Sequence, residues 1–163
     1  MKPKRVHNFG TYFVTSATWE RRALFRSELW ARLFLETLYE YRSKGKYLLH
    51  DFVLMPDHFH LLITPLELPL ERAVQFLKGG LSYRASHELG STFEIWQKGF
   101  TDHRVRDSAD YERCREYVRL NPVRAGLCQG PHLYPFGSAY PGSILDDVPQ
   151  RLKPAEYAGF RHG

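Results

Sequence analysis

The sequence predicts an α+β domain with a ferredoxin-like (split βαβ) fold, in which two helices cover one face of an antiparallel sheet. Two observations carry this prediction. Segments with the alternation of strands and segments with the periodicity of helices follow one another in the order β-α-β-β-α-β, and one additional helix comes after them. The chain has 163 residues, of which 43% are hydrophobic, and this suffices for one domain with a substantial core.

The first half of the chain contains three predicted strands and one helix. Residues 10–18 have the alternation of a strand. A helix is predicted to begin after Ser27, a favourable N-cap, and to end at Gly45. Residues 47–55 and 58–64 are predicted to pair as a hairpin. The apolar face of the helix consists of Trp30, Leu33, Phe34, Leu38 and Tyr41.

A second helix is predicted between Pro69 and Gly90. Gly79 and Gly80 lie inside it, where each glycine costs roughly 1 kcal/mol relative to alanine. Such a pair indicates a kink or a close approach of another group to the backbone. The apolar face of this helix carries Leu70, Val74, Leu77 and Leu81.

One strand and a third helix complete the predicted body. The strand spans residues 100–105, and the helix begins at a cap at Asp107 or Ser108. We expect this helix to end near Asn121, because Pro122 disfavours helical backbone in the residue before it.

The chain is expected to form one domain followed by a tail. Residues 1–128 make up the domain, and residues 129–163 form a tail that either packs on the domain or is flexible. The tail is interrupted by prolines at positions 131, 135, 141, 149 and 154.

Charge and cysteine content narrow the class of protein. The excess of 23 Lys and Arg over 18 Asp and Glu gives a net charge of +5, which favours an anionic partner such as nucleic acid. Two cysteines exclude a disulfide-rich scaffold. The basic N-terminus is not followed by an apolar stretch, and no apolar run approaches the ~18 residues of a membrane span. We therefore expect a cytoplasmic protein without a membrane partner.

The segment 55–64 (MPDHFHLLIT) contains two histidines separated by one residue. On a strand, His58 and His60 point to one face, while Phe59, Leu61 and Ile63 point to the other. The apolar three are expected to pack under the helices, so both imidazoles lie on the opposite face. Two neutral imidazoles side by side form half of a site for a divalent metal ion. Two surface histidines without a role are the alternative.

The last predicted helix has an apolar and a polar face. Tyr111, Cys114 and Val118 recur with helical spacing and form the core stripe. Tyr117 and Asn121 lie one turn apart on the adjacent polar face, where a phenol and an amide oxygen can meet a metal ion and a phosphate together. In the alternative interpretation, Tyr117 lies at the rim of the helix and Asn121 only caps its end.

Two motifs in this order resemble a known family. The stretches PDHFHLL at residues 56–62 and EYVRLNPVRAGL at residues 116–127 resemble those of the REP-associated tyrosine transposases. These belong to the HUH-endonuclease superfamily and are related to the small single-tyrosine transposases of bacterial insertion sequences. The resemblance extends over roughly residues 6–138, including the YPFGS stretch at residues 134–138.

The resemblance implies a metal-dependent single-stranded DNA endonuclease and strand transferase that acts at or near DNA hairpins. It assigns His58 and His60 as ligands of Mg²⁺ or Mn²⁺, and Tyr117 as the nucleophile that forms a 5′-phosphotyrosine link. Asn121 falls at the position of the third ligand, where the insertion-sequence branch usually has glutamine. Asparagine is shorter by one methylene, so we expect it to bind through water or only to orient the tyrosine. The resemblance is compatible with a monomer or a homodimer.

Two roles in this chemistry are open from the sequence. Tyr111 is the competing nucleophile, but it belongs to the apolar stripe and lies about 240° around the helix from Tyr117. The proton acceptor for the tyrosine is either a water on the metal ion or, as a weaker alternative, His103 beside Asp102.

Basic residues near the predicted site indicate a surface for DNA. Six arginines lie between the fourth strand and the end of the third helix, although some of them have helical spacing for ion pairs with Glu112 and Glu116. Lys4 and Arg5 belong to a possible N-terminal basic arm, and Lys78 resembles a family position that faces DNA. The six arginines are Arg104, Arg106, Arg113, Arg115, Arg119 and Arg124.

Two other classes of function are open. A ferredoxin-like sheet with exposed aromatic residues can bind single-stranded RNA or DNA without cutting it. A small metallohydrolase could use His58 and His60 to activate water. A covalent protein–DNA adduct distinguishes the transferase from both.

Overall fold

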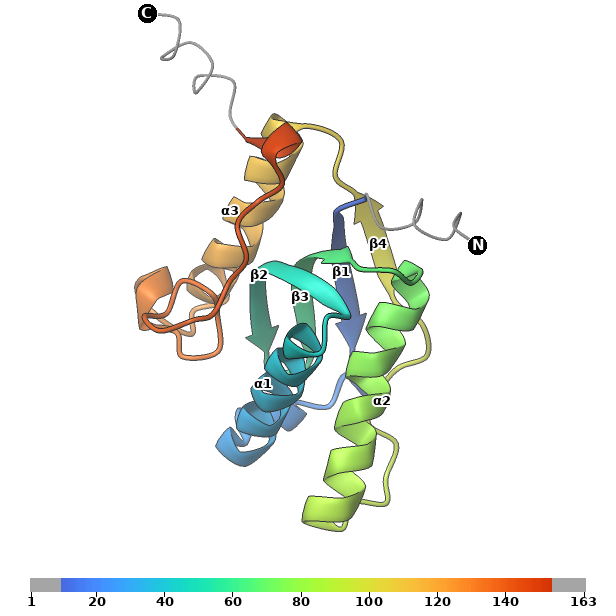
Figure 1. The fold of residues 1–163 in the computed structure, drawn as a ribbon. Helices are drawn as coiled ribbons and strands as arrows, with labels where there is room; N and C mark the ends of the chain where they lie inside the picture. The colour runs from blue at the N-terminus through green and yellow to red at the C-terminus, as the bar shows by residue number, and fades with distance from the viewer. Residues whose placement is uncertain (1–9, 154–163) are drawn as a thin grey trace, which may run out of the picture.

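Four strands form one antiparallel sheet in the order β2-β3-β1-β4 (Figure 1). The structure is a computed structural model and describes residues 10–153. The strand order and the element order are those of the predicted ferredoxin-like α+β fold, which is therefore confirmed. The strands are β1 (Tyr12–Ala17), β2 (Tyr47–Met55), β3 (His58–Pro65) and β4 (Thr101–Arg104).

Helices cover both faces of this sheet. The α1 helix (Glu28–Ser43) and the α2 helix (Leu70–Leu89) lie side by side on one face (Figure 1). The α3 helix (Ser108–Arg124) packs on the opposite face, mainly over β2 and β3. The main core lies between the sheet and α1 and α2, and it includes Val14, Phe34, Phe59, Leu61, Ile63 and Leu77.

Three helix ends are formed by the residues that the sequence indicates. Ser27 caps α1, because its side chain accepts a hydrogen bond from the amide of Trp30 at 3.4 Å. Asp107 caps α3 in the same way, with the amide of Asp110 at 2.8 Å. Gly90 ends α2 in the left-handed conformation, with φ of 68°.

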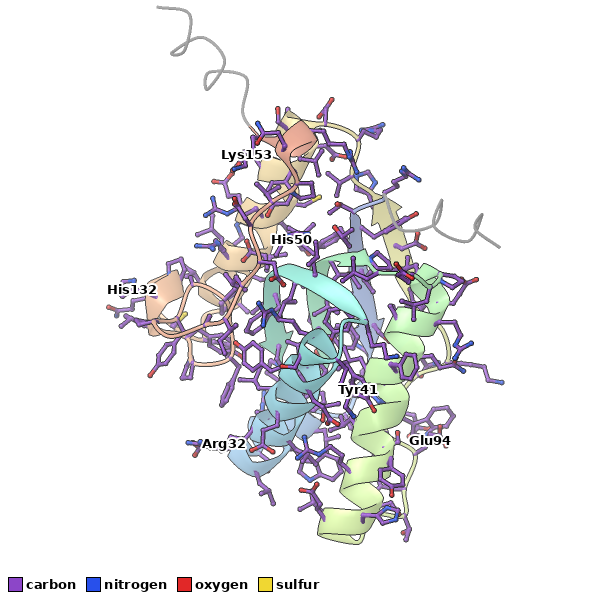
Figure 2. The ribbon with its side chains drawn as sticks, in the orientation of Figure 1. Arg32, Tyr41, His50, Glu94, His132 and Lys153 are labelled. Atoms are coloured by element: carbon purple, nitrogen blue, oxygen red, sulfur yellow. The ribbon has the colours of Figure 1, made fainter. Side chains whose placement is uncertain are left out.

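The glycine pair in α2 marks a close approach and not a kink. The helix runs through both residues without a break. A Cβ atom on Gly80 would lie 2.5 Å from Cε2 of Tyr41, whose side chain lies between α1 and α2 (Figure 2). A Cβ atom on Gly79 would have nothing within 4 Å. Gly80 therefore allows the two helices to pack closely, whereas Gly79 faces open space.

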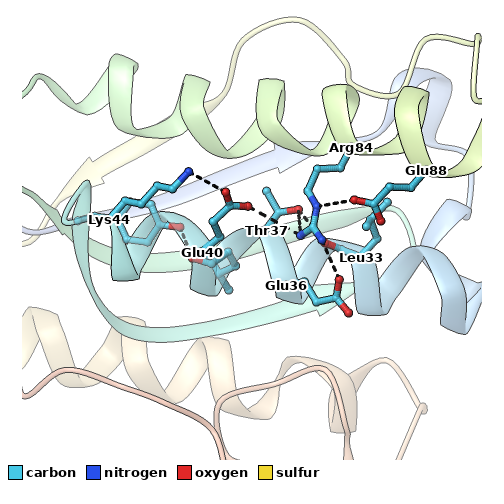
Figure 3. A network of polar contacts seen from close by, with 9 residues as sticks. Leu33, Glu36, Thr37, Glu40, Lys44, Arg84 and Glu88 are labelled. Carbon is cyan, nitrogen blue, oxygen red and sulfur yellow. Dashed lines mark hydrogen bonds and ion pairs between the residues drawn. The ribbon is translucent and has the colours of Figure 1, made fainter.

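The outer edges of α1 and α2 are joined by one arginine (Figure 3). The guanidinium of Arg84 on α2 lies 3.1 Å from the carboxylate of Glu36 on α1 and 3.1 Å from that of Glu88 one turn further along α2. Its Nη1 atom also lies 3.5 Å from the hydroxyl of Thr37. This network fixes the relative position of the two helices on the helical face of the sheet.

The α3 helix does not end at Asn121, so that prediction is wrong. It continues to Arg124 with Pro122 inside it. Proline lacks an amide proton and removes one helical hydrogen bond, but its ring is buried here and the next amides find partners. The amide of Ala125 donates to the carbonyl of Asn121 at 3.0 Å, and that of Leu127 donates to Pro122 at 2.9 Å. Asn121 consequently lies within the helix.

A β-bulge at His50 changes which residues of β2 face α3. Leu49 pairs with Ile63, and Asp51 already pairs with Leu62, so His50 is the extra residue. As a result, His50 and Asp51 are both buried on the side of α3 and the tail, while Phe52 belongs to the main core.

The described part of the tail runs along the free edge of β2 and beside α3 (Figure 1). The amide of Leu54 donates to Phe136, and the amide of Ser138 donates to Phe52. The side chain of Leu152 is fully buried in a small cluster with Leu62, Val105, Tyr111 and Cys114. The tail thus covers a strand edge that would otherwise expose unpaired backbone groups.

Candidate active site

His58 and His60 lie side by side on the α3 face of β3. Their ring centroids are 4.8 Å apart, and Phe59 between them is buried in the core on the other face. The alternation predicted for this strand is therefore confirmed. The two imidazoles are presented together at the end of the sheet where β3 begins.

Each imidazole is held through its Nδ1 atom. The carboxylate of Asp57 lies 2.7 Å from Nδ1 of His58, and the hydroxyl of Thr15 on β1 lies 2.7 Å from Nδ1 of His60. When Nδ1 donates a proton to these oxygens, Nε2 of each ring carries the free lone pair. Partners of this kind fix the tautomer and orientation of histidines that bind metal ions.

His60 has the properties of a metal ligand. Within residues 10–153, its Nε2 is the one buried side-chain nitrogen or oxygen without a hydrogen-bond partner. Burial lowers the pKa of His60 to about 3, and the neighbouring charges of His58 and Arg21 act in the same direction. The ring is therefore neutral at pH 7, as a ligand must be. The orphaned nitrogen and its oriented neighbour fit a divalent metal ion.

Tyr117 lies next to this pair. Its ring centroid is 5.3 Å from that of His60 and 5.9 Å from that of Phe13, both in edge-to-face arrangements. The side chain is 45% exposed. Asn121 follows one turn later on the same side of α3 and is half-buried. Tyr111, by contrast, is buried in the core, and burial raises the pKa of its phenol.

His103, the predicted alternative proton acceptor for Tyr117, is instead paired with a carboxylate of α3. His103 Nε2 lies 2.7 Å from the carboxylate of Asp110, which also accepts from the amide of Arg106 at 2.9 Å. His103, Asp110 and Cys114 offer possible ligand atoms within 4.8 Å of one another. However, burial and the charge of Asp110 raise the pKa of the Cys114 thiol to about 11, so it is protonated at neutral pH. The histidine pair on β3 fits a metal ion better.

Part of the arginine set lies on the same side of α3 as Tyr117. Arg113 and Arg124 fall within about 40° of Tyr117 around the helix. Arg113 and Arg106 both lie near the carboxylate of Asp110, at 3.5 and 3.7 Å, and the side chains of both are largely exposed. These three arginines are therefore available to a ligand at the Tyr117 side.

The other basic residues predicted to bind DNA are placed differently. Arg119 lies on the far side of α3 from Tyr117 and forms an ion pair at 3.2 Å with the buried carboxylate of Asp51. Arg104 lies over the ring of Tyr12, at 5.9 Å. Lys4 and Arg5 lie outside the described residues.

Lys78 belongs to α2 and therefore to the opposite face of the sheet from Tyr117. Its ammonium donates to the carbonyls of Gln97 and Gly99 at 3.1 and 2.7 Å and lies over the ring of Trp96. Burial lowers its pKa. The structure thus places Lys78 as a support for the loop before β4.

Comparison with known proteins decides the family. The profile described as Transposase IS200 like matches residues 7–121. That span includes the whole sheet, the histidine pair, Tyr117 and Asn121. The chain belongs to the IS200-like transposase family. The family profile ends within α3 of this IS200-like transposase, so it does not include the tail that runs along β2.

Individual relatives agree with this assignment. The IS200-like transposase is 23% identical over 150 residues to the REP-associated tyrosine transposase of Escherichia coli K12, covering 92% of this chain and 86% of that protein. It is 26% identical over 154 residues to an uncharacterized protein of Haemophilus influenzae, covering 76% and 86%. The structure of a REP-associated tyrosine transposase bound to a REP hairpin has the same fold, with a TM-score of 0.66, 23% identity, and coverage of 86% of this chain and 88% of that chain. The resemblance inferred from the motifs is confirmed.

Among residues 10–153, no helix is both long and apolar enough to cross a lipid bilayer.

Two residues of the site were missed from the sequence, Asp57 and Thr15. Asp57 precedes His58 directly, so a carboxylate beside an H-x-H pair was an available signal. Thr15 lies 45 residues from His60 in the sequence, and only the pairing of β1 with β3 brings the two together.

Proposed function

We propose that this IS200-like transposase is a metal-dependent strand transferase that cuts single-stranded DNA at or near hairpins through a 5′-phosphotyrosine intermediate. The observation that carries the proposal is the packing of an exposed tyrosine against a histidine whose buried Nε2 lacks a partner. The relative of known structure is bound to a REP hairpin, which supports hairpin DNA as the class of partner.

His58 and His60 would hold Mg²⁺ or Mn²⁺ through Nε2, and Asn121 is the third ligand or orients Tyr117. The bound ion would supply Lewis-acid polarisation of the scissile phosphate. The protein residues do the rest of the positioning. Asp57 and Thr15 hold the two imidazoles, while Phe13 and His60 hold the ring of Tyr117.

In the proposed reaction, the Tyr117 oxygen attacks the phosphorus and the bond from phosphorus to the 3′ oxygen breaks. The phenol loses its proton, the departing strand gains one as a 3′-hydroxyl, and the 5′-phosphate stays on Tyr117. Attack by another 3′-hydroxyl reverses these steps and releases the tyrosine. A free phenol has a pKa of about 10, so the site must favour the ionised form during attack.

The test is a covalent adduct formed on a hairpin oligonucleotide with a single-stranded flank. With Mn²⁺, the natural protein should give a labelled species that survives denaturing electrophoresis, and a chelator should abolish it. Tyr117→Phe should lose the adduct by at least about a thousandfold and still bind the hairpin. Tyr111→Phe is the matched control, because that tyrosine is buried, and it should retain the adduct.

Each other outcome has a definite meaning. Adduct formation by Tyr117→Phe would refute the assignment of the nucleophile. Hairpin binding by the natural protein without any adduct would favour a single-stranded nucleic-acid binding protein, and turnover without an adduct would favour a metallohydrolase.

A further inference from the structure

The segment between β1 and α1 has an unusual backbone next to the histidine pair. Glu20 and Arg21 are consecutive non-glycine residues in the left-handed region, with φ of 55° and 56°. Left-handed backbone is unfavourable for residues with a Cβ atom, and such residues persist only where their surroundings hold them. Strain of this kind is concentrated at functional sites.

Hydrogen bonds to the turn before β3 hold the segment in place. The amide of Thr18 donates to the carbonyl of Asp57 at 2.9 Å, and the amide of Phe25 donates to that of Pro56 at 3.0 Å. The hydroxyl of Thr18 donates to the carbonyl of Arg22 at 2.7 Å. The segment is therefore tied at both ends to the Pro56-Asp57 turn that leads into His58.

This backbone directs Arg21 toward the metal-binding histidines. Its Nε lies 3.3 Å from one carboxylate oxygen of Asp57, whose other oxygen lies 2.7 Å from Nδ1 of His58. The Arg21 side chain remains 63% exposed.

An ion pair with Asp57 does not account for this arrangement. One contact through Nε uses one of the five N–H donors of a guanidinium, and an exposed ion pair contributes little to folding. Two successive left-handed residues, by contrast, cost folding free energy. The Arg21 side chain is exposed beside a site where a phosphate is expected, and guanidinium is the side chain best suited to bind phosphate oxygens.

We propose that Arg21 is a catalytic residue that donates hydrogen bonds to the non-bridging oxygens of the scissile phosphate, and that Asp57 positions both Arg21 and His58. This inference rests on the proposed strand transfer. Tyr117 lies against His60, whereas Arg21 reaches the site beside His58. The two side chains therefore adjoin different histidines of the pair, so Arg21 can stabilise charge on the phosphate without occupying the place of the nucleophile.

The experiment measures binding, so that it does not depend on cleavage. Tyr117→Phe protein with Mn²⁺ is titrated with a hairpin oligonucleotide in which a neutral methylphosphonate replaces one phosphate of the flank at a time. At one linkage the replacement should weaken binding about tenfold, because a charge-assisted hydrogen bond is lost. Adding Arg21→Gln should reduce that loss by at least about threefold at the same linkage. The loss that remains is the weaker interaction of the neutral linkage with Mn²⁺.

A matched control removes an equal charge from the same segment. Arg26→Gln, at an exposed position, should keep the full loss at the sensitive linkage. Mn²⁺ affinity of Arg21→Gln should not fall below that of the parent, whereas Asp57→Asn should weaken it at least about tenfold, because a neutral amide oxygen holds His58 less firmly than a carboxylate.

Two results would overturn the proposal. One is a methylphosphonate profile that is the same with and without Arg21. The other is a fall in Mn²⁺ affinity in Arg21→Gln as large as that in Asp57→Asn, which would make Arg21 only a support for His58. Failure of the proposed function shows separately, as the absence of a covalent adduct in the natural protein on the unmodified oligonucleotide.

Discussion

Each imidazole of the proposed metal site is fixed by an oxygen from a different part of the chain. Asp57 is the immediate neighbour of His58, while Thr15 comes from the adjacent strand β1. Both contacts are made at Nδ1, which leaves Nε2 of each ring for a ligand. The site is thus oriented before any metal ion binds, and this lowers the cost of binding one.

His50 is a buried histidine with a structural role. Its Nε2 lies 2.8 Å from the hydroxyl of Thr64, and its Nδ1 lies 3.2 Å from the carbonyl of Asp146 in the tail. Burial lowers its pKa below the usual value of 6.5, although the hydrogen bond to the backbone of Asp146 and the charges of Asp146 and Asp147 partly oppose the shift. The ring is therefore neutral in the folded protein at neutral pH.

This shift predicts a loss of stability in mild acid. Above pH 6.5, His50 is neutral in both the folded and the unfolded protein, so it does not change the free energy of unfolding with pH. Below pH 6.5, the unfolded chain binds a proton that the folded protein does not, so the free energy of unfolding falls by up to about 1.4 kcal/mol per pH unit. His50→Gln should remove this contribution to the slope of the free energy of unfolding against pH, measured by urea unfolding with a chelator between pH 7.5 and 5.5.

The exposed His132 provides the control. His132→Gln should keep the slope of the natural protein, and equal slopes for the two variants would contradict the prediction.

At the scale of elements, the packing of α1 against α2 depends on one of two adjacent glycines. Gly80 is buried against Tyr41, and a Cβ atom there would overlap its ring. Gly79 is exposed and has open space around it. The same substitution at neighbouring positions should therefore have opposite effects.

We expect Gly79→Ala to raise the free energy of unfolding by about 0.5–1 kcal/mol, because alanine loses less backbone entropy in a helix. Gly80→Ala should lower it by about 1–3 kcal/mol, because Tyr41 must move. Chemical denaturation of the two variants measures both effects, and each serves as the control for the other. A change of the same sign in both would show that Tyr41 does not limit the approach of the helices.

At the scale of the whole molecule, the tail joins the two sides of the fold. Asp146 accepts from Arg42 on α1 at 2.9 and 2.8 Å and from the amide of Leu49 on β2 at 2.8 Å. Leu152 then reaches the cluster under α3, and Lys153 lies at the far end of this path (Figure 2). The tail therefore contacts α1, the β2 edge and α3 in turn.

Truncation after Ser138 should consequently destabilise the protein by several kcal/mol, since it removes the buried Leu152 and the paired Asp146. Leu152→Ala alone should cost about 2–5 kcal/mol, whereas Ile144→Ala, at an exposed position of the same tail, should change stability by less than about 0.5 kcal/mol. Thermal and urea unfolding measure these differences. An unchanged melting temperature after truncation would show that the tail contributes nothing to folding.

The local pattern of the sequence was sufficient for the fold and for part of the site. Alternation along β3 sends Phe59 into the core and His58 and His60 to the other face, because successive strand residues point in opposite directions. Helical spacing likewise separates the buried Tyr111 from the exposed Tyr117 on α3. Both results depend on residues close in sequence, whose relative directions are set by backbone geometry alone.

Tertiary packing decided the rest. The bulge at His50 is specified by pairing with β3 and contacts with the tail, and α3 passes through Pro122 because a buried ring offsets a lost hydrogen bond. Helical spacing separates Arg119 from Arg113 around α3, but only the packing of α3 on the sheet brings Arg119 to the buried Asp51 of β2. Such choices depend on which distant charges and apolar groups share a low-dielectric environment, and no local periodicity encodes that.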